Sequence, residues 1–83
     1  MTELFDLPVE VRLGGEEEDV AAVRMPEGWR VVARTTNSWM VDTGWWRRRV
    51  RREYRRCVLR SGDCVELYRD LETGAWHLAR RYD

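Results

Sequence analysis

The sequence predicts an all-β protein, with a small, mainly antiparallel sheet of six strands rolled into a barrel or half-barrel. Several short stretches alternate apolar and polar residues with a period of two, and clusters of turn residues separate them at close intervals. No long stretch has the apolar spacing that marks an amphipathic helix. The 83 residues suffice for one small domain, 1–83, and rolling its sheet removes exposed edges.

The N-terminal strands are predicted within residues 8–36. Apolar residues alternate with charged ones from Val9 to Leu13, and Pro26-Glu27-Gly28 has the composition of a tight turn between two further strands. Residues 1–7 are expected to be frayed, because a chain end without a visible partner orders poorly. The strands of this part are expected at residues 9–13, 20–25 and 29–36.

Residues 37–52 are predicted to be a loop rich in tryptophan and arginine. Asn37 ends the preceding strand, and only Trp39–Val41 continues as a short extended piece. Thr43 is a suitable N-cap, and arginine is a good helix former. The segment is therefore expected to contain at most one short helical turn, near residues 45–52.

Residues 53–82 are predicted to form a three-stranded antiparallel meander. Ser61-Gly62 is interpreted as a two-residue hairpin loop, which pairs Cys57 with Glu66 and leaves Cys64 diagonal to Cys57 on the same face. The Cα atoms are then about 7–8 Å apart, at or beyond the limit for a disulfide, so two free and largely buried thiols are expected. The three strands are expected at residues 54–60, 64–69 and 75–82.

The formal net charge of zero hides an asymmetry. Residues 1–27 hold eight acidic residues and two arginines, whereas residues 28–83 hold thirteen arginines and seven acidic residues. The densest basic stretch, Arg47–Arg60, contains eight arginines and one glutamate. Such a cluster indicates an anionic partner, unless it faces the acidic run Glu16–Asp19 across the fold or is simply solvated.

Catalytic and metal-binding motifs are not recognisable. A phosphate loop would need a helix and a lysine after Gly14-Gly15, and the chain contains no lysine. The single histidine, His77, falls inside a predicted strand, and the two cysteines with one histidine do not form a zinc pattern. The sequence therefore predicts a protein that is not an enzyme and needs no cofactor or metal. An interpretation as an enzyme or a ligand-binding protein would require a pocket that brings His77 and Cys57 together.

The candidate binding site combines aromatic rings with positive charge. Aromatic rings stack on exposed bases and arginines neutralise phosphates, so single-stranded nucleic acid is one fit. Tryptophan and arginine are also enriched at protein–protein hot spots, so a protein partner fits equally well. Alternatively, the indoles of Trp45 and Trp46 have a structural role and close one end of the barrel. The predicted site residues are Trp45, Trp46, Arg47, Arg48, Arg49, Arg51, Arg52, Arg55 and Arg56.

The order of short motifs along residues 8–83 resembles a known domain. These motifs are Trp39-Met40-Val41-Asp42, Trp45-Trp46, an arginine-rich run into Tyr54, Ser61-Gly62-Asp63, Gly74-Ala75-Trp76 and Arg81-Tyr82-Asp83. Their order resembles the C-terminal domain of ImuB-type proteins, bacterial homologues of Y-family translesion DNA polymerases, and its small stand-alone relatives of unassigned function. The chain departs from ImuB-type proteins in lacking the polymerase-like body and a recognisable clamp-binding motif.

The resemblance implies a non-catalytic role in bacterial DNA repair or translesion synthesis. ImuB-type proteins act as hubs that bind a sliding clamp, a RecA-like protein and an error-prone polymerase. The expected function is therefore an interaction module that docks a protein partner, such as a repair polymerase complex, through the predicted site. Nucleic-acid binding by the same residues is the alternative. We expect a cytoplasmic location and no membrane partner. The sequence does not decide between a monomer and a dimer.

Overall fold

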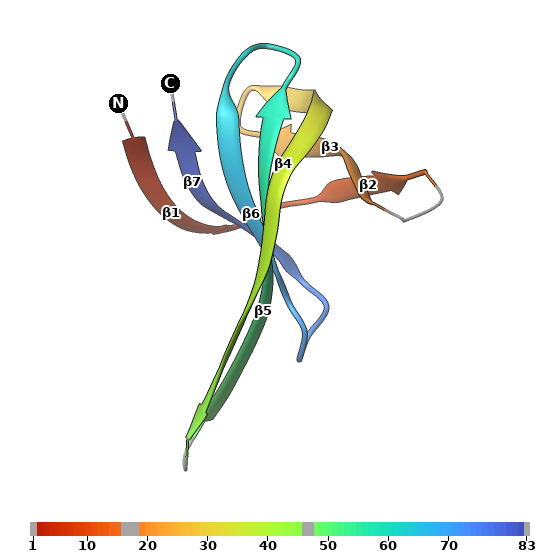
Figure 1. Ribbon diagram of the computed structural model, residues 1–83. Helices are drawn as coiled ribbons and strands as arrows, with labels where there is room; N and C mark the ends of the chain where they lie inside the picture. The colour runs from red at the N-terminus through yellow and green to blue at the C-terminus, as the bar shows by residue number, and fades with distance from the viewer. Residues whose placement is uncertain (1, 16–18, 46–47, 83) are drawn as a thin grey trace.

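The computed structural model describes residues 2–15, 19–45 and 48–82. The described residues form an antiparallel all-β structure without a helix, which confirms the predicted fold class (Figure 1). Seven strands, one more than predicted, make a single strongly curled sheet. They are β1 (Thr2–Pro8), β2 (Val11–Gly14), β3 (Asp19–Met25), β4 (Gly28–Trp45), β5 (Arg48–Leu59), β6 (Cys64–Asp70) and β7 (Trp76–Tyr82).

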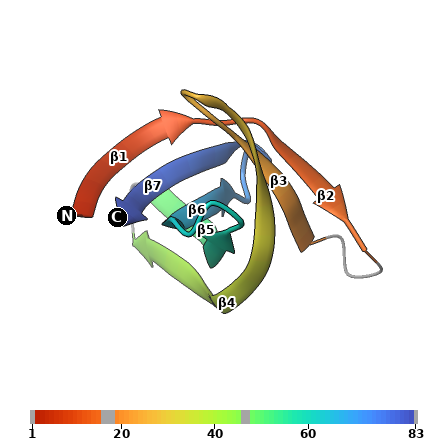
Figure 2. The same ribbon diagram turned by 90° about the horizontal axis from the view of Figure 1, so that it is seen from above.

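The two edge strands of the sheet are consecutive in the chain. The strand order is β1-β7-β6-β5-β4-β3-β2, so β1 and β2 lie at opposite ends of it. The Val9 N–H donates to the carbonyl of Trp76, the first residue of β7, and the Arg24 N–H of β3 donates to the carbonyl of Glu10. The chain therefore leaves one end of the sheet at Val9 and joins the other at Glu10, which curls the sheet into a half-barrel (Figure 2).

A small apolar core fills the concave side of the curl. The register shifts of β4, between Val32 and Arg34 and between Thr35 and Asn37, mark two bulges that bend this strand from β3 toward β5. The bend allows side chains of β3 to pack against those of β5, β6 and β7. The buried apolar cluster comprises Val20, Val23, Met25, Cys57, Leu59, Val65, Leu67 and Leu78.

The expectation that residues 1–7 are frayed is wrong for the described part of that segment. Residues 2–8 form β1, which pairs with β7 from Thr2 opposite Tyr82 to Pro8 opposite His77. Asp6 also accepts a hydrogen bond from the buried Tyr68. The sequence does not reveal this strand, because its partner β7 is almost the full chain length away. The contacts that stabilise β1 are therefore non-local.

The prediction of a loop at 37–52 is also wrong for the described residues of that segment, 37–45 and 48–52. Asn37 to Trp45 pair residue by residue with Arg56 to Arg48, as the outer part of a long β4–β5 hairpin, hereafter the arm (Figure 1). No helical turn occurs in the described residues near 45–52. Cross-strand pairing outweighs the helix propensity of arginine here, because propensity differences are a fraction of a kcal/mol per residue.

The meander of β5, β6 and β7 is confirmed, but the register of its first hairpin differs by one residue. The Gly62 N–H donates to the Leu59 carbonyl and the Leu59 N–H to the Asp63 carbonyl, so the loop has three residues. Gly62 has φ of 98°, which closes this type of loop with a bulge. Cys64 therefore pairs with Val58 and lies on the opposite face from Cys57. Both thiols are free, with Cys57 buried and Cys64 half-buried.

Candidate functional site

The predicted site residues lie along β5 and the end of the arm. Trp46 and Arg47 are outside the described residues, as are the side chains of Trp45 and Arg48. The remaining five arginines alternate between the faces of β5, because successive side chains of a strand point in opposite directions. Arg49, Arg51 and Arg55 share the face of Cys57, whereas Arg52 and Arg56 share the face of Tyr54. The structure therefore does not bring the five together on one surface.

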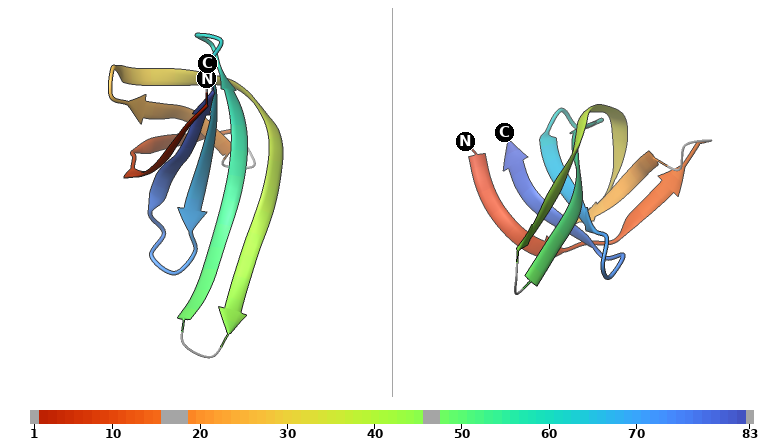
Figure 3. Two further views of the ribbon diagram at one scale, coloured as in Figure 1. Left: turned by 90° about the vertical axis from the view of Figure 1, so that its left-hand side faces the viewer. Right: turned by 60° about the horizontal axis from the view of Figure 1, so that its bottom comes forward.

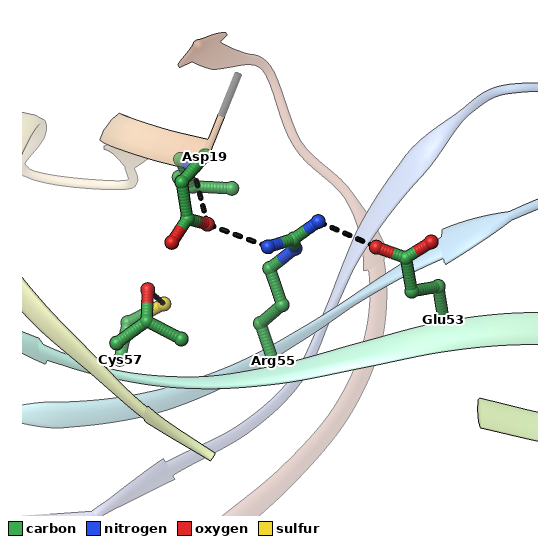
Figure 4. Close-up of polar contacts among 6 residues, drawn as sticks. Asp19, Glu53, Arg55 and Cys57 are labelled. Carbon is green, nitrogen blue, oxygen red and sulfur yellow. Dashed lines mark hydrogen bonds and ion pairs between the residues drawn. The ribbon is translucent and has the colours of Figure 1, made fainter. Parts of the chain in front are cut away.

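Arg55 is held inside the curl by two carboxylates. Its Nη1 lies 2.6 Å from Oδ1 of Asp19 in β3, and its Nη2 pairs with Glu53 two residues earlier in β5 (Figure 4). The Arg55 side chain is only 19% exposed. This guanidinium joins β3 to β5 across the curl, so its role in the fold is structural.

Arg56 is bound on the other face of β5 by a buried glutamate. Glu66 is 4% exposed and accepts hydrogen bonds from Nε and Nη2 of Arg56 at 3.2 and 2.8 Å. The hydroxyl of Tyr82 donates to the same oxygen, and Arg80 lies 3.5 Å from the other. Hydrogen bonding to Glu66 raises the pKa of Arg56 further above its ordinary value. Glu66 thus neutralises much of the charge in this cluster.

Arg49 forms a two-bond pair across the arm. Its Nε and Nη2 donate to the two oxygens of Asp42 at 3.3 and 3.1 Å. The Arg49 hydrogen bonds hold the pKa of Asp42 below its usual value. Both side chains remain exposed, so this pair is open to competition from a partner.

Arg52 lies over an aromatic ring instead of a carboxylate. Its guanidinium carbon is 4.4 Å from the ring centre of Tyr68, and its Nη1 donates to the hydroxyl of Tyr54. Burial, and then the hydrogen bond to Asp6, raises the pKa of Tyr68 to about 12. Arg52 therefore covers a neutral ring that belongs to a longer aromatic row.

The aromatic row crosses four adjacent strands on one face of the sheet. Trp39 stacks on Tyr54 with ring centres 5.3 Å apart and planes at 5°. Tyr54 lies 5.3 Å from Tyr68, which in turn stacks on His77 at 4.7 Å. Such ring pairs each contribute about 0.5–1.5 kcal/mol beyond the area they bury. The sequence analysis missed the row, and correct cross-strand register is the signal that would have revealed it.

A polar groove brings together three of the predicted arginines. It has a volume of about 470 Å³ and lies where β5 extends beyond the end of β6, beside the β6–β7 turn. The Nε of Arg51 is buried there without a hydrogen-bond partner among the described residues. The groove thus offers guanidinium and carboxylate groups side by side. Its lining is Asp6, Arg49, Val50, Arg51, Arg52, Asp70, Glu72 and Thr73.

His77 and Cys57 do not form the shared pocket that an interpretation of the protein as an enzyme would require. His77 lies in the aromatic row, whereas Cys57 is buried in the core on the other face of the sheet. Burial raises the pKa of the Cys57 thiol, which makes it a poorer nucleophile. Within residues 2–15, 19–45 and 48–82, no three His, Cys, Asp or Glu side chains are grouped to hold a metal ion.

The comparisons with known proteins yield no relative. Neither models of protein families, nor curated proteins, nor solved structures match the chain. No helix in the described part of the chain is long and apolar enough to cross a membrane. The resemblance to the C-terminal domain of ImuB-type proteins therefore stays a prediction from the sequence.

Proposed function

We propose that the protein is a non-catalytic interaction module that docks a protein partner in the groove where β5 extends beyond the end of β6. The observation that carries this proposal is the groove that gathers Arg49, Arg51 and Arg52 with three acidic residues. By the sequence resemblance, the partner belongs to bacterial DNA repair or translesion synthesis. The arm extends beyond the ends of the other strands (Figure 3).

The mixture of charges in the groove favours a protein partner over a nucleic acid. A phosphate backbone that approaches the three arginines also approaches Asp6, Asp70 and Glu72, which repel it. A polypeptide carries charges of both signs and can match each group. The pairing of Arg55 and Arg56 with carboxylates of the same chain further reduces the positive charge that β5 offers to phosphates.

Affinity capture from a bacterial lysate tests the proposal with two charge-matched variants. The groove variant carries Arg49→Glu and Arg51→Glu, and the control carries Arg60→Glu and Arg69→Glu at exposed positions outside the groove. The partner should be lost by the groove variant and retained by the control. Identical partners for the wild type and the groove variant would count against the proposal, provided that circular dichroism shows both to be folded.

A separate titration tests whether the protein binds nucleic acid directly. Gel shifts with single- and double-stranded DNA are measured from low to moderate salt, because neutralised phosphates release counterions and make affinity fall with salt. Tight, salt-sensitive binding that the Arg49→Glu and Arg51→Glu variant loses would replace the protein partner with DNA. Absence of binding at low salt would remove the nucleic-acid alternative.

A further inference from the structure

The outer edge of β4 has no strand partner along most of its length. β4 pairs with β3 only over its first four residues, Gly28–Val31. From Val32 to Trp45 it pairs with β5 on its other side alone. In the described part of the chain, this leaves a long row of backbone N–H and C=O groups open on one side, as Figure 3 shows for the outermost strand of the arm.

The hydrogen bonds of β5 establish which residues of β4 direct their backbone outward. The Leu71 N–H donates to the Arg51 carbonyl and the Leu59 N–H to the Asp63 carbonyl. The odd-numbered residues of β5 therefore direct their backbone groups toward β6. Because these directions alternate along an antiparallel strand, the even-numbered residues, such as Tyr54, direct theirs toward β4.

The partners of those even-numbered residues in β4 are hydrogen-bonded to β5. Trp39 pairs with Tyr54 and Val41 pairs with Arg52, so their N–H and C=O groups are used within the hairpin. The intervening residues Ser38, Met40 and Asp42 direct theirs to the open side. A strand added at this edge would form its hydrogen bonds with these three residues.

The side chains along this edge do little to prevent pairing. No charge occurs from Thr35 to Val41, and neither proline nor lysine occurs in β4. Trp39 is 37% exposed and Met40 is 58% exposed. Proteins protect open edges with charges, prolines or bulges. The bulges of β4 lie upstream of Asn37 and Asp42 is the single charged residue in Asn37–Thr43, so this stretch is a regular edge with little protection.

We propose that this edge pairs with the same edge of a second copy of the chain. The two strands run antiparallel over Asn37–Thr43, and the two-fold axis passes between the Met40 residues of the two copies. Trp39 of each copy then lies opposite Val41 of the other, an aromatic and β-branched pair of the kind that stabilises sheets. The backbone of Ser38 in each copy exchanges hydrogen bonds with that of Asp42 in the other.

Charge, regularity and side-chain matching favour a second copy in this register. The Asp42 carboxylate meets an uncharged serine, so no like charges face each other. An axis at Trp39 would allow only five regular pairs before the bulge at Thr36, against seven for an axis at Met40. An axis at Val41 would place the exposed Met40 opposite Asp42. Two-fold pairing of identical edges is self-limiting, because it consumes both open edges and gives a closed dimer.

The dimer leaves the proposed docking groove free. The groove borders the edge of β5 that faces away from β4, whereas the dimer uses the edge of β4 that faces away from β5. Self-pairing and partner docking therefore use different edges of the hairpin, and the Arg49–Asp42 ion pair connects the two. Substitution of Met40 or of Arg51, neither of which belongs to this pair, should disturb one interaction and leave the other intact.

Amide hydrogen exchange at two protein concentrations tests the register directly. Between a dilute and a concentrated sample, exchange at Ser38, Met40 and Asp42 should slow by at least about tenfold. Exchange at Trp39 and Val41 should already be slow in the dilute sample, since β5 binds those groups. Sedimentation equilibrium on the same samples should show a monomer that becomes a dimer. A monomer at millimolar concentration would overturn the proposal.

Two matched variants establish whether the dimer uses this edge. Met40→Lys places a charge on the axis next to its copy and should abolish the dimer. Val31→Lys is the control, because Val31 is 49% exposed on the same strand but has its edge covered by β3. The control should dimerise like the wild type. A dimer that survives Met40→Lys, with both variants folded by circular dichroism, would place the interface elsewhere and overturn the proposal.

Discussion

The hydroxyl of Tyr68 donates a hydrogen bond of 2.5 Å to the carboxylate of Asp6, across 62 residues of chain. The bond connects β1 to β6, the middle strand of the meander. Its donor, Tyr68, contacts both Tyr54 and His77 in the aromatic row. An edge strand that would otherwise rest on backbone pairing with β7 thereby gains a side-chain anchor in β6.

Removal of this hydroxyl should weaken β1 selectively. Tyr68→Phe retains the ring and its stacking but leaves Asp6 to water, so the expected loss in free energy of unfolding is about 1 kcal/mol. Amides of β1 should exchange faster, while those of β5 should change only with the global stability. Urea unfolding with residue-resolved exchange measures both. Equal protection of β1 in the variant and the wild type would contradict the anchoring role.

Stability should fall at alkaline pH in a way that Tyr68 controls. The folded state raises the pKa of this hydroxyl to about 12, above the ordinary value of 10.0. The unfolded chain therefore loses this proton first, so the contribution of the neutral phenol is complete below about pH 10 and lost between about pH 10 and 12. The Tyr68→Phe variant should lack this part of the decline. Ultraviolet titration of tyrosinate should show one late-titrating group that the variant lacks.

Glu66 should matter more for stability than any exposed carboxylate. It accepts bonds from Arg56 and Tyr82 while almost fully buried. Glu66→Ala leaves these donors without their acceptor, and because Arg56 is partly exposed the expected cost is about 1–2 kcal/mol. Glu72→Ala, at an exposed position, should change stability by less than about 0.5 kcal/mol. Chemical denaturation of the two variants compares them, and equal stabilities would contradict the structural role of Glu66.

Substitution of Arg55 should affect folding before it affects binding. Arg55→Ala leaves Asp19 and Glu53 without the guanidinium between them, and a loss of about 2 kcal/mol is expected. Arg60→Ala, at an exposed turn position, is the control and should be nearly neutral. Thermal unfolding distinguishes the two. If a partner is lost by a folded, equally stable Arg55→Ala protein, Arg55 belongs to the binding surface after all.

The two thiols should differ in reactivity. Burial raises the pKa of Cys57 and removes it from solvent, whereas Cys64 is half-buried on the opposite face of the hairpin. Alkylation at neutral pH, followed by mass spectrometry, should modify Cys64 first and Cys57 only as the protein unfolds. Simultaneous modification of both in the folded protein would contradict the register of the β5–β6 hairpin.

The parts of the fold that the sequence predicted are those whose signals are local. The meander of 53–82 shows alternating residues and turn glycines, and Gly62 does adopt the positive φ that a turn requires. The strand at 2–8 depends on β7, and the arm depends on pairing between two polar segments. Their apolar residues stand next to one another, as in Leu4-Phe5 and Trp39-Met40-Val41, and do not alternate with polar ones, so a period of two did not reveal either strand.

The candidate site was predicted from composition, which ignores the direction of side chains. Adjacent arginines of a strand lie on opposite faces, so the described arginines from Arg49 to Arg56 do not form one surface. The acidic partners of Arg55 and Arg56 come from β3, β5 and β6. Only the register of these strands shows that Glu66 lies opposite Arg56.

The pairing of Thr2 with Tyr82 also constrains how the molecule is made. During synthesis, β1 leaves the ribosome before the other six described strands, whereas its neighbour β7 emerges after them. Until residue 82 is free, one side of the nascent sheet stays incomplete and the open side of β4 is already exposed. A chaperone that shields the growing polypeptide would therefore be most useful in that interval.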